Sequence, residues 1–334
     1  MTDRIDTLQA LAAVIGKTPA AIHLKVIDHL DETALRWIAA SPLAFITIAE
    51  QADIGVTLAG GEAGFASGDA GALRLPLALL DDPGLVRAGA VFGSLFLAPG
   101  IGETLRVNGR VVEVNRDDAL IAVDECYVHC AKALIRSHFW QAEPLAGIPD
   151  DPAAFIAASR FMALGTSDGE GHADLSPKGD PAGLMAMRDA TGLWFADRPG
   201  NRRVDSFRNI LVQPNVAAAL LVPGSHHIAI ARGRAHLTCG EAERARFAVQ
   251  GKMPLLAVGV EDPAIELRPS AALRRANLWP LRETAQGIVP AKMFAAHVKL
   301  NKDKGLGARL AGAVMSIPGL MQKGLDKDYK DNLY

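Results

Sequence analysis

The second half of this sequence repeats the landmarks of the first half in the same order, and this repeat constrains the fold more than any other feature. An Ala-Ala-Ser triplet precedes an apolar run at residues 39–41 and again at residues 157–159. The further matches are residues 91–100 with 216–224, the Gly-Arg pairs at 109–110 and 233–234, and residues 133–140 with 272–279. Chance is a poor explanation for ordered matches, and two copies of about 120 residues indicate a duplicated domain rather than a solenoid.

Local patterns within each copy predict a mainly β protein with flanking helices, an α+β fold. Strands are expected at residues 43–49, 90–97, 104–114 (with a glycine bulge), 161–164 and 192–196, and helices at 5–15, 20–40, 128–135 and 204–211. Residues 141–152 contain three prolines and form the natural linker. We therefore divide the chain into a first copy with N-terminal helices (1–145), a second copy (150–283) and a C-terminal helical tail (284–334).

Composition limits the classes of protein to which the chain can belong. Its 334 residues are 49% hydrophobic and 22% charged, with a formal net charge of −2, which is typical of an ordinary soluble globular protein. This balance favours neither nucleic acid nor an anionic membrane as a partner, and no long apolar segment indicates export or membrane insertion. Three cysteines are too few for a disulfide framework. We therefore expect a cytoplasmic protein.

The two copies carry different polar residues. The second copy contains the string Ser-Pro-Lys-Gly-Asp at 176–180 and the string Asp-Arg-Pro-Gly-Asn-Arg-Arg at 197–203, whereas the first copy carries Glu-Thr-Leu-Arg-Val-Asn at 103–108. Neither copy has the other's strings, which predicts one composite site assembled from both copies. Lysine, arginine and glycine-rich turns suit a phosphate monoester. The alternative is a hairpin with solvated charges at its tips.

Four strings resemble sequences of FMN-dependent flavoproteins of the pyridoxamine 5'-phosphate oxidase type. They are residues 165–183, 197–211, 99–110 and 129–140, and the resemblance covers about residues 24–283. In single-domain relatives all four strings occur in one copy, whereas here they are divided between two. The resemblance implies a tandem duplicated FMN-binding split β-barrel that forms an intrachain pseudo-dimer, with one FMN between the two copies.

The resemblance also implies roles for individual residues. The residues that would hold the FMN phosphate are Lys178, Arg202, Arg203 and Ser206, assisted by Asn201. Those beside the ribityl chain and the flavin edge would be Asp174, Leu175, Ser176 and Pro177. The first half would line its side of the cleft with Arg106, Asn108, Lys132, Arg136 and Trp140. Arg202 and Arg203 point in alternate directions, so which of them contacts phosphate stays open. Ser206 could instead cap the helix that follows it.

The expected function is that of an FMN-dependent oxidoreductase acting on a small organic substrate. Hydride would pass to or from flavin N5, no catalytic residue is assigned, and no metal is expected because Cys126 and Cys130 lack a second ligand pair. A non-catalytic flavin carrier, a haem or other tetrapyrrole binder, and a barrel that has lost its cofactor stay open. The candidate haem ligands are His226, His227, His236 and His297. The protein would be either a monomer that contains an internal pseudo-dimer or a homodimer of such chains.

Overall fold

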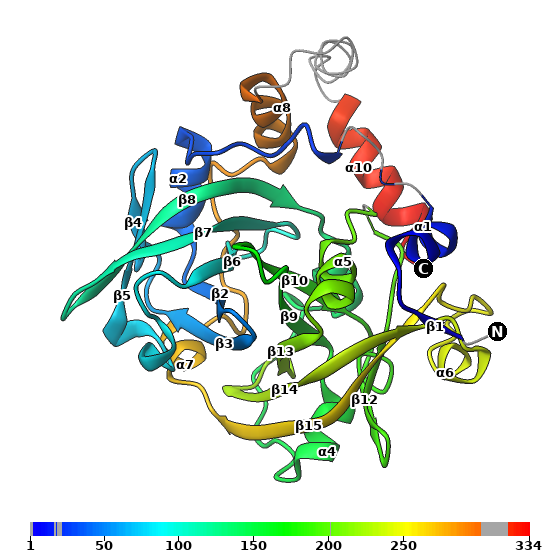
Figure 1. Cartoon of the computed structure of the whole chain (residues 1–334). Helices are drawn as coiled ribbons and strands as arrows, with labels where there is room; N and C mark the ends of the chain where they lie inside the picture. The colour runs from blue at the N-terminus through cyan, green and yellow to red at the C-terminus, as the bar shows by residue number, and fades with distance from the viewer. Residues whose placement is uncertain (1–2, 17, 19–21, 201, 302–319) are drawn as a thin grey trace.

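The computed structural model describes residues 3–16, 18, 22–200, 202–301 and 320–334. Two antiparallel sheets lie side by side, with helices around their outer faces (Figure 1). The first sheet is formed by the N-terminal half, in blue and cyan, and the second by the green and yellow segments that follow. The chain is therefore mainly β with flanking helices, as its patterns predict. Within the described part, no helix has both the length and the apolar character that crossing a membrane requires.

The first sheet has the strand order β3-β2-β6-β7-β8-β5-β4. Its strands are β2 (Leu43–Glu50), β3 (Asp53–Gly60), β4 (Ser67–Gly68), β5 (Ala72–Pro76), β6 (Val91–Leu97), β7 (Thr104–Val114) and β8 (Asp118–His129). The helical segments of this half are α1 (Leu8–Ile15), α2 (Glu32–Ala40), the 3₁₀ turns η2 (Leu77–Leu79) and η3 (Pro83–Leu85), and α3 (Lys132–Arg136).

The second sheet has the order β10-β9-β13-β14-β15-β12-β11, and the short strand β1 (Arg4–Ile5) pairs with β14. Its strands are β9 (Phe161–Ser167), β10 (Ala173–Gly179), β11 (Met187–Asp189), β12 (Gly192–Ala196), β13 (Asn215–Leu221), β14 (His227–Thr238) and β15 (Ala257–Pro269). The helices are α4 (Pro152–Ala158), α5 (Asp205–Val212), α6 (Glu241–Ala245), α7 (Ala271–Ala276), α8 (Pro290–Leu300) and α10 (Leu320–Asp331).

The strand orders of the two sheets coincide when strands are matched in chain order, from β2 with β9 to β8 with β15. One irregularity in each sheet coincides as well, although β7 and β8 have a second register shift at Val111/Glu113. The register between β7 and β8 shifts at Asn108/Gly109, and the register between β14 and β15 shifts between Arg232 and Arg234. Both shifts fall at the repeated Gly-Arg pairs, where a bulge bends the strand. β1 is the clear exception, because this N-terminal strand joins the second sheet.

Each half places a helix on the other half's sheet. Helix α3 packs on β10, and α7 packs on β3, beside which it is seen in Figure 1. The guanidinium Nε of Arg136 donates to the carbonyl of Gly179 over 2.8 Å, and that of Arg275 donates to the carbonyl of Gly60 over the same distance. A Cβ at either glycine would overlap a backbone carbonyl of the facing helix. The two contacts are thus related like the two sides of a symmetric dimer.

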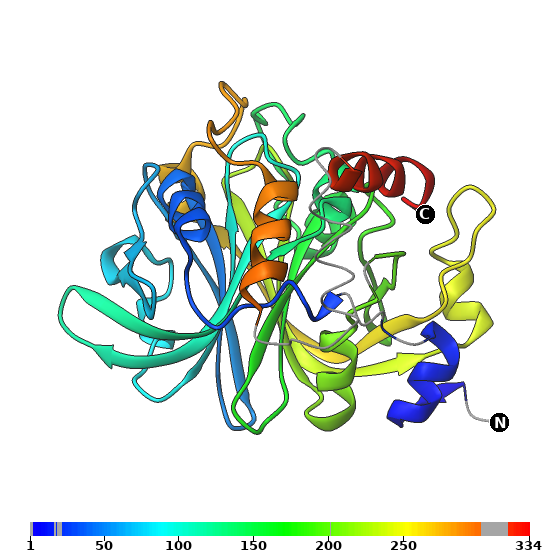
Figure 2. The ribbon, with the colours of Figure 1, turned by 90° about the horizontal axis from the view of Figure 1, so that it is seen from above.

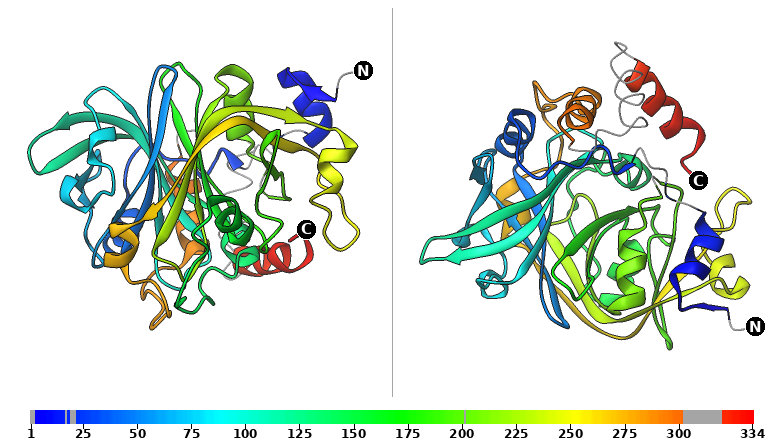
Figure 3. Two further views of the ribbon diagram at one scale, coloured as in Figure 1. Left: turned by 90° about the horizontal axis from the view of Figure 1, so that it is seen from below. Right: turned by 45° about the horizontal axis from the view of Figure 1, so that its top comes forward.

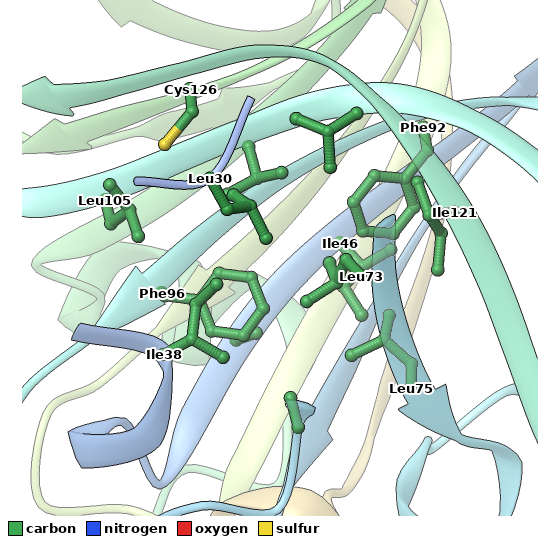
Figure 4. Close-up of a cluster of buried hydrophobic side chains, with 14 of the residues drawn as sticks. Leu30, Ile38, Ile46, Leu73, Leu75, Phe92, Phe96, Leu105, Ile121 and Cys126 are labelled. Carbon is green, nitrogen blue, oxygen red and sulfur yellow. The ribbon is translucent and has the colours of Figure 1, made fainter. Parts of the chain in front are cut away.

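Three large apolar clusters and a small one around Trp194, Ala196 and Phe247 form the core of the described residues. One fills the first half, where Phe92, Phe96 and Ile121 meet side chains from α2 (Figure 4), and another fills the second half. The third lies between the halves, and its aromatic centre is Phe139, whose ring lies 5.2 Å from the rings of both Phe161 and Trp279. Each fully buried large apolar side chain contributes about 1.5–3 kcal/mol, so the central cluster ties the halves into one body (Figures 2 and 3).

Two helix predictions are wrong in their extent. The helix expected at 20–40 begins at Glu32, because the Asp31 side chain caps it and the preceding Ile27 forms a strand-like bridge with Cys126. Residues 19–21 lie outside the described residues. The helix expected at 128–135 begins at Lys132, because residues up to His129 continue β8 and pair with β7. In both places, buried side chains at helical spacing belong to extended or irregular backbone.

Candidate functional site

A cavity of about 840 Å³ lies between the halves. Its walls come from β7, β8 and α3 of the first half, from β10 and the β12–α5 segment of the second half, and from the C-terminal residues. Eight Lys or Arg residues and four Asp residues line it, so a ligand there meets an excess of positive charge. The volume falls within the range of about 300–1,000 Å³ that is usual for small-molecule and cofactor sites.

Arg106 connects the halves at the inner end of this cavity. Its side chain is 1% exposed and donates to the Asp174 carboxylate (3.0 Å), the Leu175 carbonyl (2.5 Å) and the Ser176 hydroxyl (3.1 Å), all on β10. It also donates to the hydroxyl of Tyr127 from its own half (2.6 Å). A planar guanidinium can serve several acceptors at once, so a first-half residue fixes the backbone of the second-half strand.

Asp174 and Asn108 lie behind Arg106, away from the large cavity. Asn108 donates to Asp174 over 3.2 Å, and Asn209 donates to the other oxygen of Asp174 over 3.1 Å. Both Asp174 and Asn108 line a neighbouring cavity of about 280 Å³. The Leu175 side chain is buried in the central cluster, so this residue offers only its carbonyl to the site. These residues support the cavity wall rather than line the cavity.

Lys178 carries the least satisfied charge at the site. Its ammonium lies 4.8 Å from the centre of the Phe207 ring and 5.6 Å from that of Phe195. Within the described part of the chain it makes no hydrogen bond. Burial lowers the pKa of Lys178, and the Asp197 carboxylate opposes that shift. Burial likewise raises the pKa of Asp197. An anion bound next to the ammonium would offset the free-energy cost of removing that charge from water.

The turn before α5 faces the same cavity. Arg202 and Val204 have φ angles of 55° and 52°, the left-handed region that a β-branched residue such as Val204 rarely adopts. Ser206 is buried in the first turn of α5 and lines the cavity. Its alternative role as the helix cap is not observed, because the cap position is Val204. Strained backbone of this kind clusters at ligand-binding turns. Asn201, also expected here, lies outside the described residues.

The structure separates the two arginines of this turn. The guanidinium of Arg203 stacks 4.3 Å from the Tyr127 ring, pairs with Asp205 and lies 3.4 Å from Glu125. Arg202 is exposed at the cavity wall. Both arginines line the cavity: Arg203 joins the first half to the α5 turn, whereas the side chain of Arg202 is exposed.

Asp205 is the second unusual acid of the site. Burial and the nearby Asp174 carboxylate raise its pKa to about 6, against the opposing charges of Arg203 and Arg106. Its carboxyl group therefore changes charge close to neutral pH, where most aspartates are fully ionised.

The first-half cations Lys132 and Arg136 meet the C-terminal residues. Lys132 forms an ion pair with Asp328 over 2.8 Å. Arg136 donates to the carbonyls of Pro199 (3.2 Å) and Leu333 (2.9 Å). Sequence reasoning missed these partners, as well as the loop residues Lys252–Leu255 that also line the cavity. Neither segment has a counterpart in the first copy, so the repeat could not locate them.

Trp140 does not line the cavity. Its indole Nε1 donates to the Ile101 carbonyl over 2.7 Å, and its ring packs 5.1 Å from that of Phe139 in the central cluster. The four candidate haem ligands are also elsewhere: none of His226, His227, His236 and His297 is among the described residues that line it. Cys126 is buried in the first cluster, whereas Cys130 lies at the cavity.

Comparison with known proteins gives one match. The sequence model of the family described as pyridoxamine 5'-phosphate oxidase matches residues 148–266. Searches of curated proteins and of solved structures gave no match. The matched range, which is less than half of the chain, contains Lys178, Arg202 and Ser206, and over this segment the sequence is similar to that family. Arg106, Lys132 and Arg136 lie outside that range.

Proposed function

We propose that this chain is a flavoprotein that binds one FMN in the cavity between its halves and transfers electrons to or from a small organic substrate. The observation that carries the proposal is that one cavity is lined by the polar residues of both halves. Arg106, Lys132 and Arg136 come from the first half, and Lys178, Arg202 and Ser206 come from the second. Arg106 of the first half is bonded to β10 of the second, on the strand that presents the unsatisfied ammonium of Lys178.

The architecture supports a tandem split barrel with an internal pseudo-dimer. The matched strand orders, the two bulges and the exchanged helices α3 and α7 are what fusion of two copies of a dimeric barrel would produce. One cofactor per chain is then expected, because only the second copy carries the strings with Lys178 and Arg202.

The residues present fit FMN. The buried Nε of Arg106 has no hydrogen-bond acceptor among the described residues, and the Lys178 ammonium has there only the faces of two aromatic rings and the charge of Asp197. Lys178, Arg202, Ser206 and the first amides of α5 would hold the phosphate. Ser176 and the backbone of Pro177 would lie beside the sugar chain and ring. Arg203 would position the turn through Tyr127 and Asp205.

When bound, FMN would supply hydride-transfer chemistry that no side chain of this protein can perform. The protein would contribute position, exclusion of water and charge. The Arg106 guanidinium would place a fixed positive charge at the inner end of the cavity. The carboxyl of Asp205 could hold a proton near neutral pH because its pKa is raised to about 6. Met185, Met253 and Leu255 would add apolar contacts to the bound group.

The test is an absorbance spectrum of the purified protein, with the released flavin quantified per chain. We expect about one equivalent. The double variant Lys178→Ala/Arg202→Ala should lose the flavin while keeping its circular dichroism, because Arg202 is exposed and Lys178 contacts the core only through the faces of Phe195 and Phe207. The matched control is Arg116→Ala/Arg188→Ala, which removes two exposed charges that are not part of the cavity lining.

Retention of stoichiometric flavin by the first double variant would refute the phosphate assignment. Two equivalents per chain would refute the composite site. A Soret band in place of flavin maxima would support the haem alternative, which the positions of the four candidate histidines do not favour.

A further inference from the structure

The C-terminal residues occupy one wall of the cavity. Helix α10 and the three residues after it contribute Asp328, Asn332 and Tyr334 to the cavity lining. Figure 1 shows α10, in red, beyond the strands of both sheets and joined to neither. Its side chains from Lys323 onward are exposed or half-buried, and polar contacts join this part of the segment to α3.

Two cations of α3 bind oxygen atoms of this segment. Lys132 is 2% exposed and pairs with the carboxylate of Asp328, which is itself 46% exposed. Four residues further along, and so on the same helical face, Arg136 donates a hydrogen bond to the Leu333 carbonyl. A buried ammonium needs a negative partner, and here a half-exposed residue of a polar segment supplies it.

The segment has further attachments: α10 packs against α8, and the guanidinium of Arg198 lies 5.6 Å from the centre of the Tyr334 ring. The Tyr329 hydroxyl donates to Glu103 and accepts from the amide of Ala131, and Lys252 donates to the carbonyl of Tyr334 over 2.8 Å. The carboxylate of Asp328 also accepts from Asn332 within its own segment, over 3.0 Å. An exchange of the Asp328 carboxylate for another carboxylate would leave Lys132 paired and the local charge unchanged.

We propose that Lys132 and Arg136 form a subsite for the carboxylate group of an organic substrate, and that Asp328 and Leu333 occupy this subsite as an internal competitor. The subsite rests on the proposed function, since it lies in the cavity assigned to FMN. It is separate from the phosphate set, because Lys132 and Arg136 belong to the first half whereas Lys178, Arg202 and Ser206 belong to the second. The substrate is accordingly an organic acid, admitted when the C-terminal segment moves away.

The test is a calorimetric titration of the full-length, FMN-loaded protein with succinate. Removal of the competing carboxylate in Asp328→Ala should tighten succinate binding by about fivefold or more, because the subsite no longer needs to be vacated. Asp331→Ala is the matched control: it removes an exposed acid of the same helix that is not part of the cavity lining, and it should bind like the wild type. Adding Lys132→Ala to Asp328→Ala should abolish the gain.

An affinity for succinate in Asp328→Ala equal to that in Asp331→Ala would overturn the proposal, and so would a gain that survives Lys132→Ala. The thermal midpoint of the Lys132→Ala double variant shows whether it is folded, and Lys132→Met provides a second variant that keeps the volume of the side chain. The outcome is independent of flavin. If the wild type binds no FMN, the proposed function fails, yet the same titrations of the flavin-free chain still compare Asp328→Ala with its control.

Discussion

The raised pKa of Asp205 should make the stability of the folded protein depend on pH. Its pKa is raised from 3.8 to about 6, so the folded protein holds a proton on this carboxyl between those values where the unfolded chain does not. Folding is therefore favoured by Asp205 at low pH, and this contribution is lost as the pH rises through 6. The ordinary effect of paired carboxylates has the opposite sign, as in Asp31, whose hydrogen bonds with His297, Ala34 and Thr33 outweigh its burial and lower its pKa to about 2.

We expect Asp205→Asn to change the pH dependence of stability. The free energy of unfolding of the wild type relative to the variant should fall by about 1–3 kcal/mol between pH 4 and pH 7. Urea denaturation at several pH values measures this difference, and Asp331→Asn serves as an exposed control. A wild-type-minus-variant difference that stays constant, or rises, across that range would show that the carboxyl is not held protonated.

At the level of residues, most of the site residues predicted from the sequence line the cavity. The sequence did not distinguish them from residues that lie behind the cavity wall, such as Asp174 and Asn108. Lys178, Arg202 and Ser206 lie at the cavity with Arg106, Lys132 and Arg136, on the strands β7 and β10, the helices α3 and α5 and the turn before α5. Trp140 was misplaced because proximity in a string does not decide which way a side chain points. Its repeat counterpart, Trp279, packs in the same central cluster, and that equivalence was the better guide.

At the level of elements, the sequence predicted those whose pattern is set by one sheet. Strand β7 has the predicted bounds and the predicted bulge, and α5 lies within one residue of its expected range. The segment before α2 could not be predicted in this way. Its apolar residues, such as Ile27 and Leu30, are buried by the first cluster while the backbone is irregular, and spacing alone does not distinguish that case from a helix.

The exchanged helices provide a prediction at this scale. Gly60→Ala and Gly179→Ala should each destabilise the protein by about 1–3 kcal/mol, because the added methyl overlaps a carbonyl of the facing helix and forces α7 or α3 outward. Only Gly179→Ala should also weaken FMN binding, since α3 and β10 line the cavity. Gly84→Ala, which adds its methyl to open space, is the control.

Urea denaturation and flavin retention after gel filtration give the two readouts. Equal loss of flavin in the Gly60 and Gly179 variants would argue against a single site on the α3 side. No loss of stability in either variant would argue against the close helix–strand contact itself.

For the whole molecule, the central cluster means that the halves should stay together without the peptide that joins them. A protease site inserted between Ala146 and Gly147 lies in an exposed stretch. After cleavage, the two fragments should elute together with the flavin and separate only in denaturant, because separation would expose Phe139, Phe161 and the other members of the cluster. Dissociation in plain buffer would contradict this account, and the uncleaved protein carrying the same insertion is the control.

At this scale the repeat predicted two similar halves, and the two sheets have the same strand order. The single site shared by the two halves stays a prediction. The segments at the chain ends carried no such signal. Strand β1 joins the second sheet, and the residues after α10 bind α3 of the first half. Both contacts join parts of the chain that are far apart in sequence and unmatched in the repeat, so no local pattern could have located them.

The pairing of Gly60 with Gly179 has a consequence for how this molecule can change over generations. In a symmetric dimer of identical chains, every substitution is expressed twice, and a change that helps one interface position must be tolerated at its twin. Here the two positions are encoded separately. Substitutions at the contact between Gly60 and α7 can therefore accumulate without any change at the contact between Gly179 and α3, which borders the cavity.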